Sequence, residues 1–197
     1  MRYPAKETAA RHDRILKEAS RLFRERGFEN VTVGEVMKAA GLTHGAFYAH
    51  FGSKQDLQLA TVDEAGRIFR KEVIEPALAA APGLAQLLAV CDAFFDYLER
   101  RIFPGGCFFA GAVLEMGTRP GPVKEQVAAF QDMFTGLIRQ FTVTALERHE
   151  LPANEDADAL TFELSGIILA ANANFVLHGD PAALRMAKHV VRRRLGV

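Results

Sequence analysis

Apolar side chains recur three and four residues apart along nearly all of this 197-residue sequence, and this spacing limits the fold more than any other feature. It is the period of one face of an α-helix, whereas the two-residue alternation of a half-buried strand is scarce. Glycine or proline stands at the breaks between the periodic stretches. The sequence therefore predicts an all-α fold.

About nine helices are expected from this spacing and its breaks. Gly27 would end the first helix, and Pro76 would bend or end the fourth because a proline has no backbone N–H to donate. The predicted ranges are about 8–26, 33–40, 43–50, 53–76, 83–102, 107–116, 121–150, 154–178 and 181–195.

The second, third and fourth predicted helices begin with residues that cap helices. Thr32 and Glu35 form a capping box, in which a hydroxyl and a carboxylate satisfy backbone N–H groups at the helix start. Thr43 and Ser53 are the expected N-caps of the next two helices. Gly41 lies between the second and third helices and can adopt the positive φ that a sharp turn requires. Two short helices joined by a tight turn are typical of a helix-turn-helix, whose second helix lies in the major groove of DNA.

The third predicted helix has small and polar residues on its outward face. A projection at 100° per residue groups His44, Gly45 and Tyr48 on that face, whereas Phe47 would fill the angle between the two short helices. Thr43 and His44 stand at the N-terminal end, where recognition helices usually contact base edges. The pattern predicts DNA binding through this face.

The segment from Thr32 to Leu57 resembles the TetR/AcrR family of bacterial transcriptional regulators. It contains TVGEV and then AAGLTHGAFYAHFGSKQDL, so that the threonine cap, the Ala-Gly turn and the Tyr-x-His-Phe-x-x-Lys end follow in the family's order. The similarity is clear over residues 8–60 and only loose beyond. Ala49 departs from the family, which often has a second aromatic residue beside the tyrosine.

The resemblance implies a role in DNA binding for six residues. Three would contact phosphates and three would lie at the major groove: Thr32, Tyr48 and Lys54 in the first set, and Thr43, His44 and Gly45 in the second. Two alternatives stay open at this point. Thr32 would serve as a helix cap whether or not DNA is present, and an exposed Tyr48 would also suit a protein contact. The projection places His50 nearer the buried side, which favours packing over DNA contact.

Charge is unevenly distributed although the formal net charge is zero. Residues 1–55 carry ten basic and six acidic side chains, a net +4, and residues 56–197 carry 14 basic and 18 acidic ones, a net −4. A basic module on an acidic body is what a phosphate-binding head would look like. We expect a helix-turn-helix DNA-binding domain at residues 1–52 and a larger antiparallel helical domain for effector binding and dimerisation at residues 53–197.

Residues 157–178 have apolar side chains on two sides of the predicted helix. Such a helix is either central in its own domain or shared with a partner. We interpret it, together with the helix at about 181–195, as a four-helix homodimer interface, which the resemblance also implies, and a buried helix in a monomer is the alternative. Two-fold symmetry would place two recognition helices on the half-sites of a palindromic, double-stranded operator. The interface residues are expected to be Leu164, Ile168, Leu169, Ala173 and Val176.

The expected body is rich in aromatic side chains. In proteins that the chain resembles, the helices of the body enclose an apolar effector pocket, although aromatics at helical spacing also form ordinary cores. The candidates for effector binding are Phe94, Phe95, Phe108, Phe130, Met133 and Phe134.

Several other kinds of site are not expected. The N-terminus does not resemble a signal peptide and no apolar run reaches the ~18 residues of a membrane span, so we expect a cytoplasmic protein. Cys91 and Cys107 are too few for a disulfide scaffold, and Cys107 is either a buried core residue or a redox sensor. The histidines lack metal-ligand spacing, and no nucleophile–base pair suggests an enzyme or a cofactor.

The sequence therefore predicts a transcriptional regulator, a repressor in the first interpretation, that responds to a small apolar ligand. The alternative is a small-molecule-binding helical protein whose head docks on another protein. Binding to DNA weakens steeply as salt rises, and that property separates the two.

Overall fold

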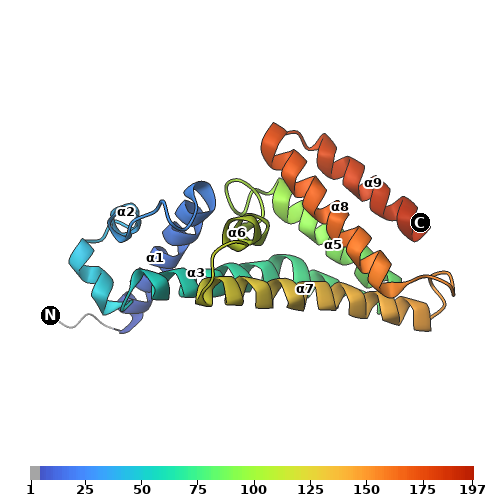
Figure 1. Ribbon diagram of the computed structural model, residues 1–197, viewed down its shortest axis with the longest axis horizontal. Coiled ribbons are helices and arrows are strands. Elements are labelled where there is room, and N and C mark those ends of the chain that lie inside the picture. Colours follow the sequence, from blue (N-terminus) through green and yellow to red (C-terminus); the bar gives the residue numbers. More distant parts are fainter. Residues whose placement is uncertain (1–4) are drawn as a thin grey trace. The chain divides into compact units, whose positions relative to one another are not determined.

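The computed structural model describes residues 5–197, and within that range every regular element is helical (Figure 1). This confirms the predicted all-α class. Residues 1–4, on which the expected absence of a signal peptide partly rests and which include Arg2 of the charge count, lie outside the described residues. The elements are α1 (Ala5–Arg26), α2 (Val33–Ala39), the 3-10 helix η1 (His44–Ala49), α3 (Lys54–Phe69), the π-helical turn η2 (Arg70–Ile74), α4 (Glu75–Leu78), α5 (Leu84–Glu99), α6 (Phe108–Met116), α7 (Pro122–Glu147), α8 (Ala157–His178) and α9 (Ala182–Leu195).

Residue contacts divide the chain into two compact units. The first combines the residues up to Gly66 with Phe103–Ala128, and the second combines Arg67–Ile102 with Ala129–Val197. Helix α6 and the start of α7 therefore belong with the N-terminal helices, although the 36 residues of Arg67–Ile102 lie between the two segments in sequence. The division into domains 1–52 and 53–197 stays a prediction.

The core of the first unit forms on one face of α1. Ile15, Ala19, Leu22 and Phe23 recur at helical spacing and are buried. The ring of Phe28 stacks on Phe23 at 5.0 Å between centroids, and it meets the edge of Phe108 from α6 at 5.7 Å. These ring contacts join α1, the loop after it and α6 into one apolar cluster.

Polar contacts fix the end of α1 against α6. The Arg24 guanidinium donates to the carbonyl oxygens of Cys107, at 3.1 Å, and of Gly105. Glu115 accepts from the backbone N–H of Phe28 at 2.8 Å. Gly27 ends α1 as predicted, with φ +84°, and a Cβ there would lie 3.0 Å from the Glu115 carboxylate. The positive φ therefore favours glycine, and any other residue would also displace the Glu115 carboxylate.

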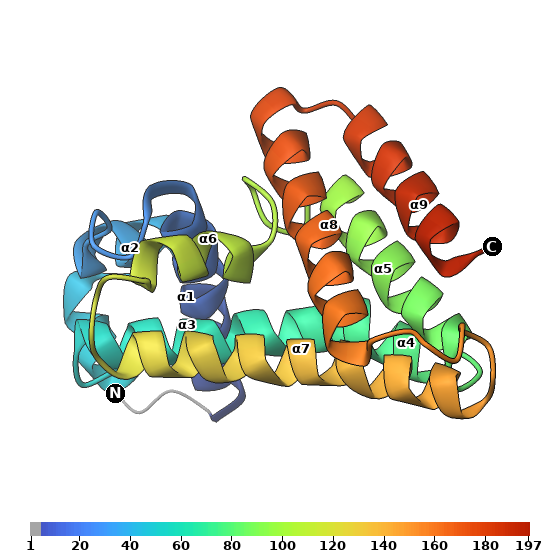
Figure 2. The same cartoon turned by 45° about the vertical axis from the view of Figure 1, so that its right-hand side comes forward.

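The second unit is built on α5, α8 and α9, each of which packs on the other two (Figure 2). Its aromatic cluster surrounds Phe69, whose ring centroid lies 5.0 Å from Phe134, 5.3 Å from Phe130 and 6.1 Å from Phe94. The edge-to-face arrangement of the first two pairs is the one that aromatic rings prefer.

Carboxylates and arginines join the ends of helices in this unit. The Arg194 guanidinium on α9 makes two parallel hydrogen bonds of 2.8 Å to Glu155 and a further contact with Glu163 on α8. Glu150 accepts from the N–H of Leu84 at 2.8 Å and so satisfies one backbone donor at the start of α5.

Pro76 does not end the fourth helix. The chain passes from α3 through the π-helical turn η2 into α4, which continues to Leu78. The π-helical turn just before the proline accommodates its ring and its missing N–H, and the helix ends two residues beyond the predicted end.

Helix α8 is the one described helix long and apolar enough to cross a membrane by composition, with a mean hydropathy of 1.5 in its most apolar window. Of that window 39 % is buried inside the chain, and helices that pack in a soluble core have the same composition.

Candidate nucleic-acid interface

The short helix α2 begins with the capping box predicted from the sequence. The Thr32 hydroxyl accepts from the backbone N–H of Glu35 at 3.2 Å, and the Glu35 carboxylate accepts from the Thr32 N–H at 2.8 Å. The same carboxylate also accepts from the Thr32 hydroxyl at 2.7 Å. These contacts hold Thr32 exposed at the start of a helix whose Val36 and Met37 are buried.

The turn after α2 leads into a 3-10 helix rather than an α-helix. Gly41 has φ +68°, the left-handed conformation expected of it. Thr43 is the N-cap residue, as predicted, with the extended backbone of that position, but its side chain makes no cap hydrogen bond.

The outward face of η1 carries the residues proposed from the sequence. Thr43, His44, Gly45 and Tyr48 are all exposed, and the Tyr48 side chain reaches 68 % exposure. Phe47 points the other way, with 1 % exposure, and its ring packs near that of Phe51 at 5.6 Å. The buried Phe47 side chain thus holds the segment that carries these four exposed residues against the core.

Lys54 stands at the start of α3, beside the cap of that helix. Ser53 accepts from the Asp56 N–H at 3.1 Å, as its predicted cap role requires. The Lys54 ammonium donates to the carbonyl oxygen of Glu29 at 3.2 Å, and its side chain is half-buried. It therefore lies next to the loop that leads into Thr32.

His50 packs as expected. Its ring centroid lies 5.7 Å from that of His12 on α1, and His12 stacks on Phe51 at 4.8 Å. Burial lowers the pKa of His50, and the nearby charges of His12 and Arg11 lower it further. This histidine is neutral near pH 7 and belongs to the packing behind η1.

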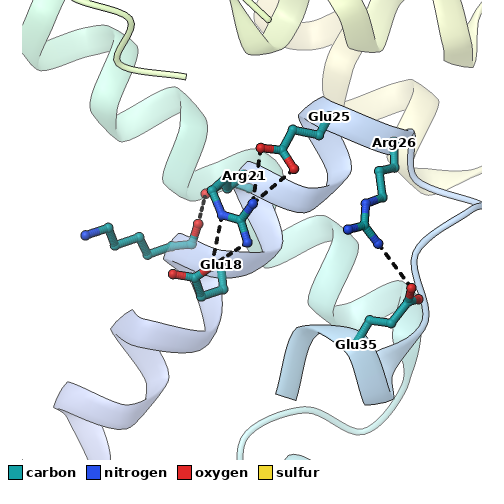
Figure 3. Close-up of polar contacts among 7 residues, drawn as sticks. Glu18, Arg21, Glu25, Arg26 and Glu35 are labelled. Atoms are coloured by element: carbon teal, nitrogen blue, oxygen red, sulfur yellow. Dashed lines mark hydrogen bonds and ion pairs between the residues drawn. The ribbon is translucent and has the colours of Figure 1, made fainter. Parts of the chain in front are cut away.

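The arginines of α1 are largely occupied by carboxylates. Arg21 lies between Glu18 and Glu25, at 3.0 Å from each, and these partners raise its pKa (Figure 3). Arg26 contacts Glu35 of α2 at 3.2 Å. The formal positive charge of the N-terminal residues therefore overstates the cationic surface they present.

The residues expected at a dimer interface separate into two groups. Leu164 and Ile168 are 0 % and 6 % exposed within the chain, so they belong to its own core and offer no surface to a partner. Leu169, Ala173 and Val176 are exposed. Sequence periodicity found both stripes of α8 but did not indicate which one packs on the same chain.

The aromatic candidates for effector binding separate as well. Phe94, Phe130 and Phe134 lie beside Phe69 in the second unit, and Phe95 lies beside Phe94 there. Phe108 lies in the first unit, where it packs on Phe28. Met133 is 37 % exposed. Phe108 therefore does not join the cluster of the other candidates.

Cys91 and Cys107 are free and buried. Burial raises the pKa of the Cys91 thiol to about 12, so it is not a thiolate near neutral pH. Among residues 5–197 no group of three or more His, Cys, Asp or Glu side chains has a metal-binding arrangement.

Sequence reasoning assigned Glu35 only a capping role and did not single out Arg26. Their contact joins α1 to α2 across nine residues of sequence, and nothing in the local pattern marks it.

A capped helix, a left-handed glycine turn and a short helix with an exposed polar face, packed on α1, define a helix-turn-helix module of an all-α regulator. The comparisons agree with this class. The family described as "Bacterial regulatory proteins, tetR family" matches residues 15–61, and "Tetracyclin repressor-like, C-terminal domain" matches residues 83–191. The chain belongs to the TetR family, whose members are transcriptional regulators rather than enzymes.

Relatives and solved structures extend over most of the chain. The transcriptional regulator AcuR of Cereibacter sphaeroides is 27 % identical over 158 residues, which cover 79 % of this chain and 72 % of AcuR. A TetR transcriptional regulator from Chloroflexus aurantiacus has a TM-score of 0.89 at 25 % identity, with 97 % and 96 % of the two chains covered. AibR, in complex with isovaleryl coenzyme A and operator DNA, shares the fold with a TM-score of 0.75 at 20 % identity, with 93 % and 97 % covered.

Proposed function

We propose that this TetR-family regulator is a cytoplasmic repressor that binds a palindromic operator as a homodimer and is controlled by a small apolar ligand. The observation that carries the proposal is the exposed face of η1. This short helix buries the aromatic side chain of Phe47 and exposes four small or polar residues beside it, an arrangement suited to contact with a binding partner. Residues 1–52 would form the DNA-binding domain and residues 53–197 the effector-binding and dimerisation domain.

The residues at this interface would divide their work. Thr43, His44 and Gly45 stand at the start of η1, where side chains reach base edges and the missing side chain of Gly45 permits close approach. Tyr48 and Lys54 would contact phosphates, together with Thr32. Phosphate contacts fix the register on the duplex and base contacts select the sequence.

The homodimer is supported by apolar side chains that α8 and α9 leave exposed. On α8 these include Phe162 at 81 % exposure, Leu169 at 49 % and Leu177 at 77 %. Met186 of α9 is 62 % exposed. Apolar surface of this extent on two adjacent helices is costly in water, and a second copy would bury it by two-fold symmetry.

Control by a ligand is supported by the aromatic cluster around Phe69 in the second unit. Phe94, Phe95, Phe130 and Phe134 would contact an apolar molecule there. AibR was crystallised with both isovaleryl coenzyme A and operator DNA, so the fold is compatible with a small molecule and DNA together. A ligand shifts DNA affinity only if it binds two states of the protein unequally.

The test is fluorescence anisotropy on DNA from upstream of the protein's own coding sequence, repeated over a series of salt concentrations. Binding should weaken steeply as salt rises. Tyr48→Ala and Lys54→Ala should weaken binding to every sequence, whereas changes at Thr43 or His44 should alter sequence preference. A protein that binds no DNA even at low salt would support the alternative, a head that docks on another protein.

A further inference from the structure

Glu35 lies among groups that are suited to meet a phosphate. Its carboxylate contacts the Arg26 guanidinium at 3.2 Å (Figure 3). It also accepts from the Thr32 hydroxyl at 2.7 Å. The side chains of Arg26 and Glu35 are 52 % and 43 % exposed, so this ion pair faces solvent. The Glu35 carboxylate therefore binds both the Thr32 hydroxyl and the Arg26 guanidinium, on the surface beside the proposed DNA contacts.

The surroundings of Glu35 favour its charged form. Hydrogen bonds from the backbone and side chain of Thr32 lower its pKa, and the charges of Arg26 and Lys54 lower it further. The negative charge is consequently present throughout the neutral range. Lys54, one of the cations proposed to contact phosphate, is thus close enough to interact with it.

We propose that Glu35 is an internal competitor for the DNA backbone and that it sets how tightly the head binds DNA. This inference rests on the proposed function, because it needs DNA to approach this face. An incoming phosphate would be repelled by the carboxylate and would have to take Thr32 and Arg26 away from it. Since phosphate contacts are independent of base sequence, Glu35 should lower the affinity for operator and non-operator DNA by the same factor.

Glu35→Gln separates the charge from the cap. A glutamine oxygen can still accept from the Thr32 N–H, since glutamine also serves in capping boxes. The variant removes the repulsion and frees Arg26. We expect affinity for both kinds of DNA to rise about three- to tenfold, as for one like-charge contact near a wet surface. The log–log salt slope should steepen by about 0.9 if Arg26 then neutralises one phosphate.

Glu25→Gln is the matched control. It changes the net charge equally, on the same unit, but Arg21 keeps Glu18 as its partner. A change in affinity of less than about twofold is expected there, because screening weakens a general charge effect over distance. In the Glu35→Gln background, Arg26→Ala should remove most of the gain in DNA affinity. In the wild-type background, the same substitution should lower DNA affinity by a smaller factor.

Thermal unfolding establishes that each variant is folded at the assay temperature. If Glu35→Gln is not, Arg26→Ala in the wild-type protein gives the second reading. If Arg26→Ala lowers DNA affinity by less than about twofold, Arg26 is held by Glu35 and the proposal is supported. A tenfold loss of affinity would show that Arg26 already contacts DNA in the wild-type protein, and would overturn the proposal.

The outcomes distinguish this inference from the proposed function. The inference about Glu35 is supported if the wild-type protein binds DNA, Glu35→Gln binds it more tightly, and Glu25→Gln does not. If the wild-type protein binds DNA and folded Glu35→Gln binds it equally or more weakly, the role of Glu35 is overturned and the proposed function stands. Absence of wild-type binding at low salt overturns both proposals.

Discussion

Phe47 and Tyr48 are adjacent in sequence and are expected to respond to alanine substitution in opposite ways. Phe47 is 1 % exposed and packs near Phe51, so Phe47→Ala would leave a cavity behind η1. A buried Phe→Ala change costs about 3–5 kcal/mol of the free energy of unfolding. For a chain of this length that corresponds to a fall in melting temperature of roughly 6–20 °C.

Tyr48→Ala should leave the melting temperature nearly unchanged. Its side chain is 68 % exposed, and surface changes of this kind usually stay within about 0.5 kcal/mol. Instead, the loss of a phosphate contact should weaken DNA binding about three- to tenfold for operator and non-operator DNA alike.

Circular dichroism melts, together with anisotropy measured well below both melting temperatures, test this contrast. The reasoning is refuted if Tyr48→Ala lowers the melting temperature as far as Phe47→Ala does. It is also refuted if Tyr48→Ala binds DNA as tightly as the wild-type protein.

Three further perturbations follow from the described contacts. Leu169→Glu, at a half-exposed position on α8, should give a monomer in analytical ultracentrifugation, and a persisting dimer would exclude this part of α8 from the interface. Because burial lowers the pKa of His50 below the unfolded value of about 6.5, the unfolded chain binds the extra proton and stability should fall as pH drops through about 6.5. His50→Gln should flatten that part of the melting-temperature profile, and an identical profile in the two proteins would contradict the assignment. Arg194→Gln should lower the free energy of unfolding by about 1–2 kcal/mol in urea titrations, since it breaks the paired hydrogen bonds to Glu155, and no change would mean that solvent screens the pair fully.

Most of the helices could be predicted from the sequence because their ends are encoded locally. Gly27 stops α1 by its dihedral, and Thr32 and Glu35 cap α2 through side chains three residues apart. Such signals need no knowledge of tertiary contacts. The predicted ranges of α6 and α9 accordingly agree with the structure to within one residue.

Features that depend on distant contacts could not be predicted in this way. The placement of Phe108 follows from ring contacts with Phe28, eighty residues earlier. The burial of Leu164 and Ile168 depends on which side of α8 meets α5 and α9. The 3-10 form of η1 was not predicted either, because short segments carry little periodic signal.

The most direct test of the central claim is a hydroxyl-radical footprint of the protein on DNA upstream of its coding sequence. The account predicts two protected half-sites related by a palindrome, with centres about one helical turn apart, and weaker protection of both in Tyr48→Ala at the lowest protein concentration that protects with the wild type. A single protected half-site would contradict the dimeric arrangement. No protection at low salt would contradict DNA binding by this head.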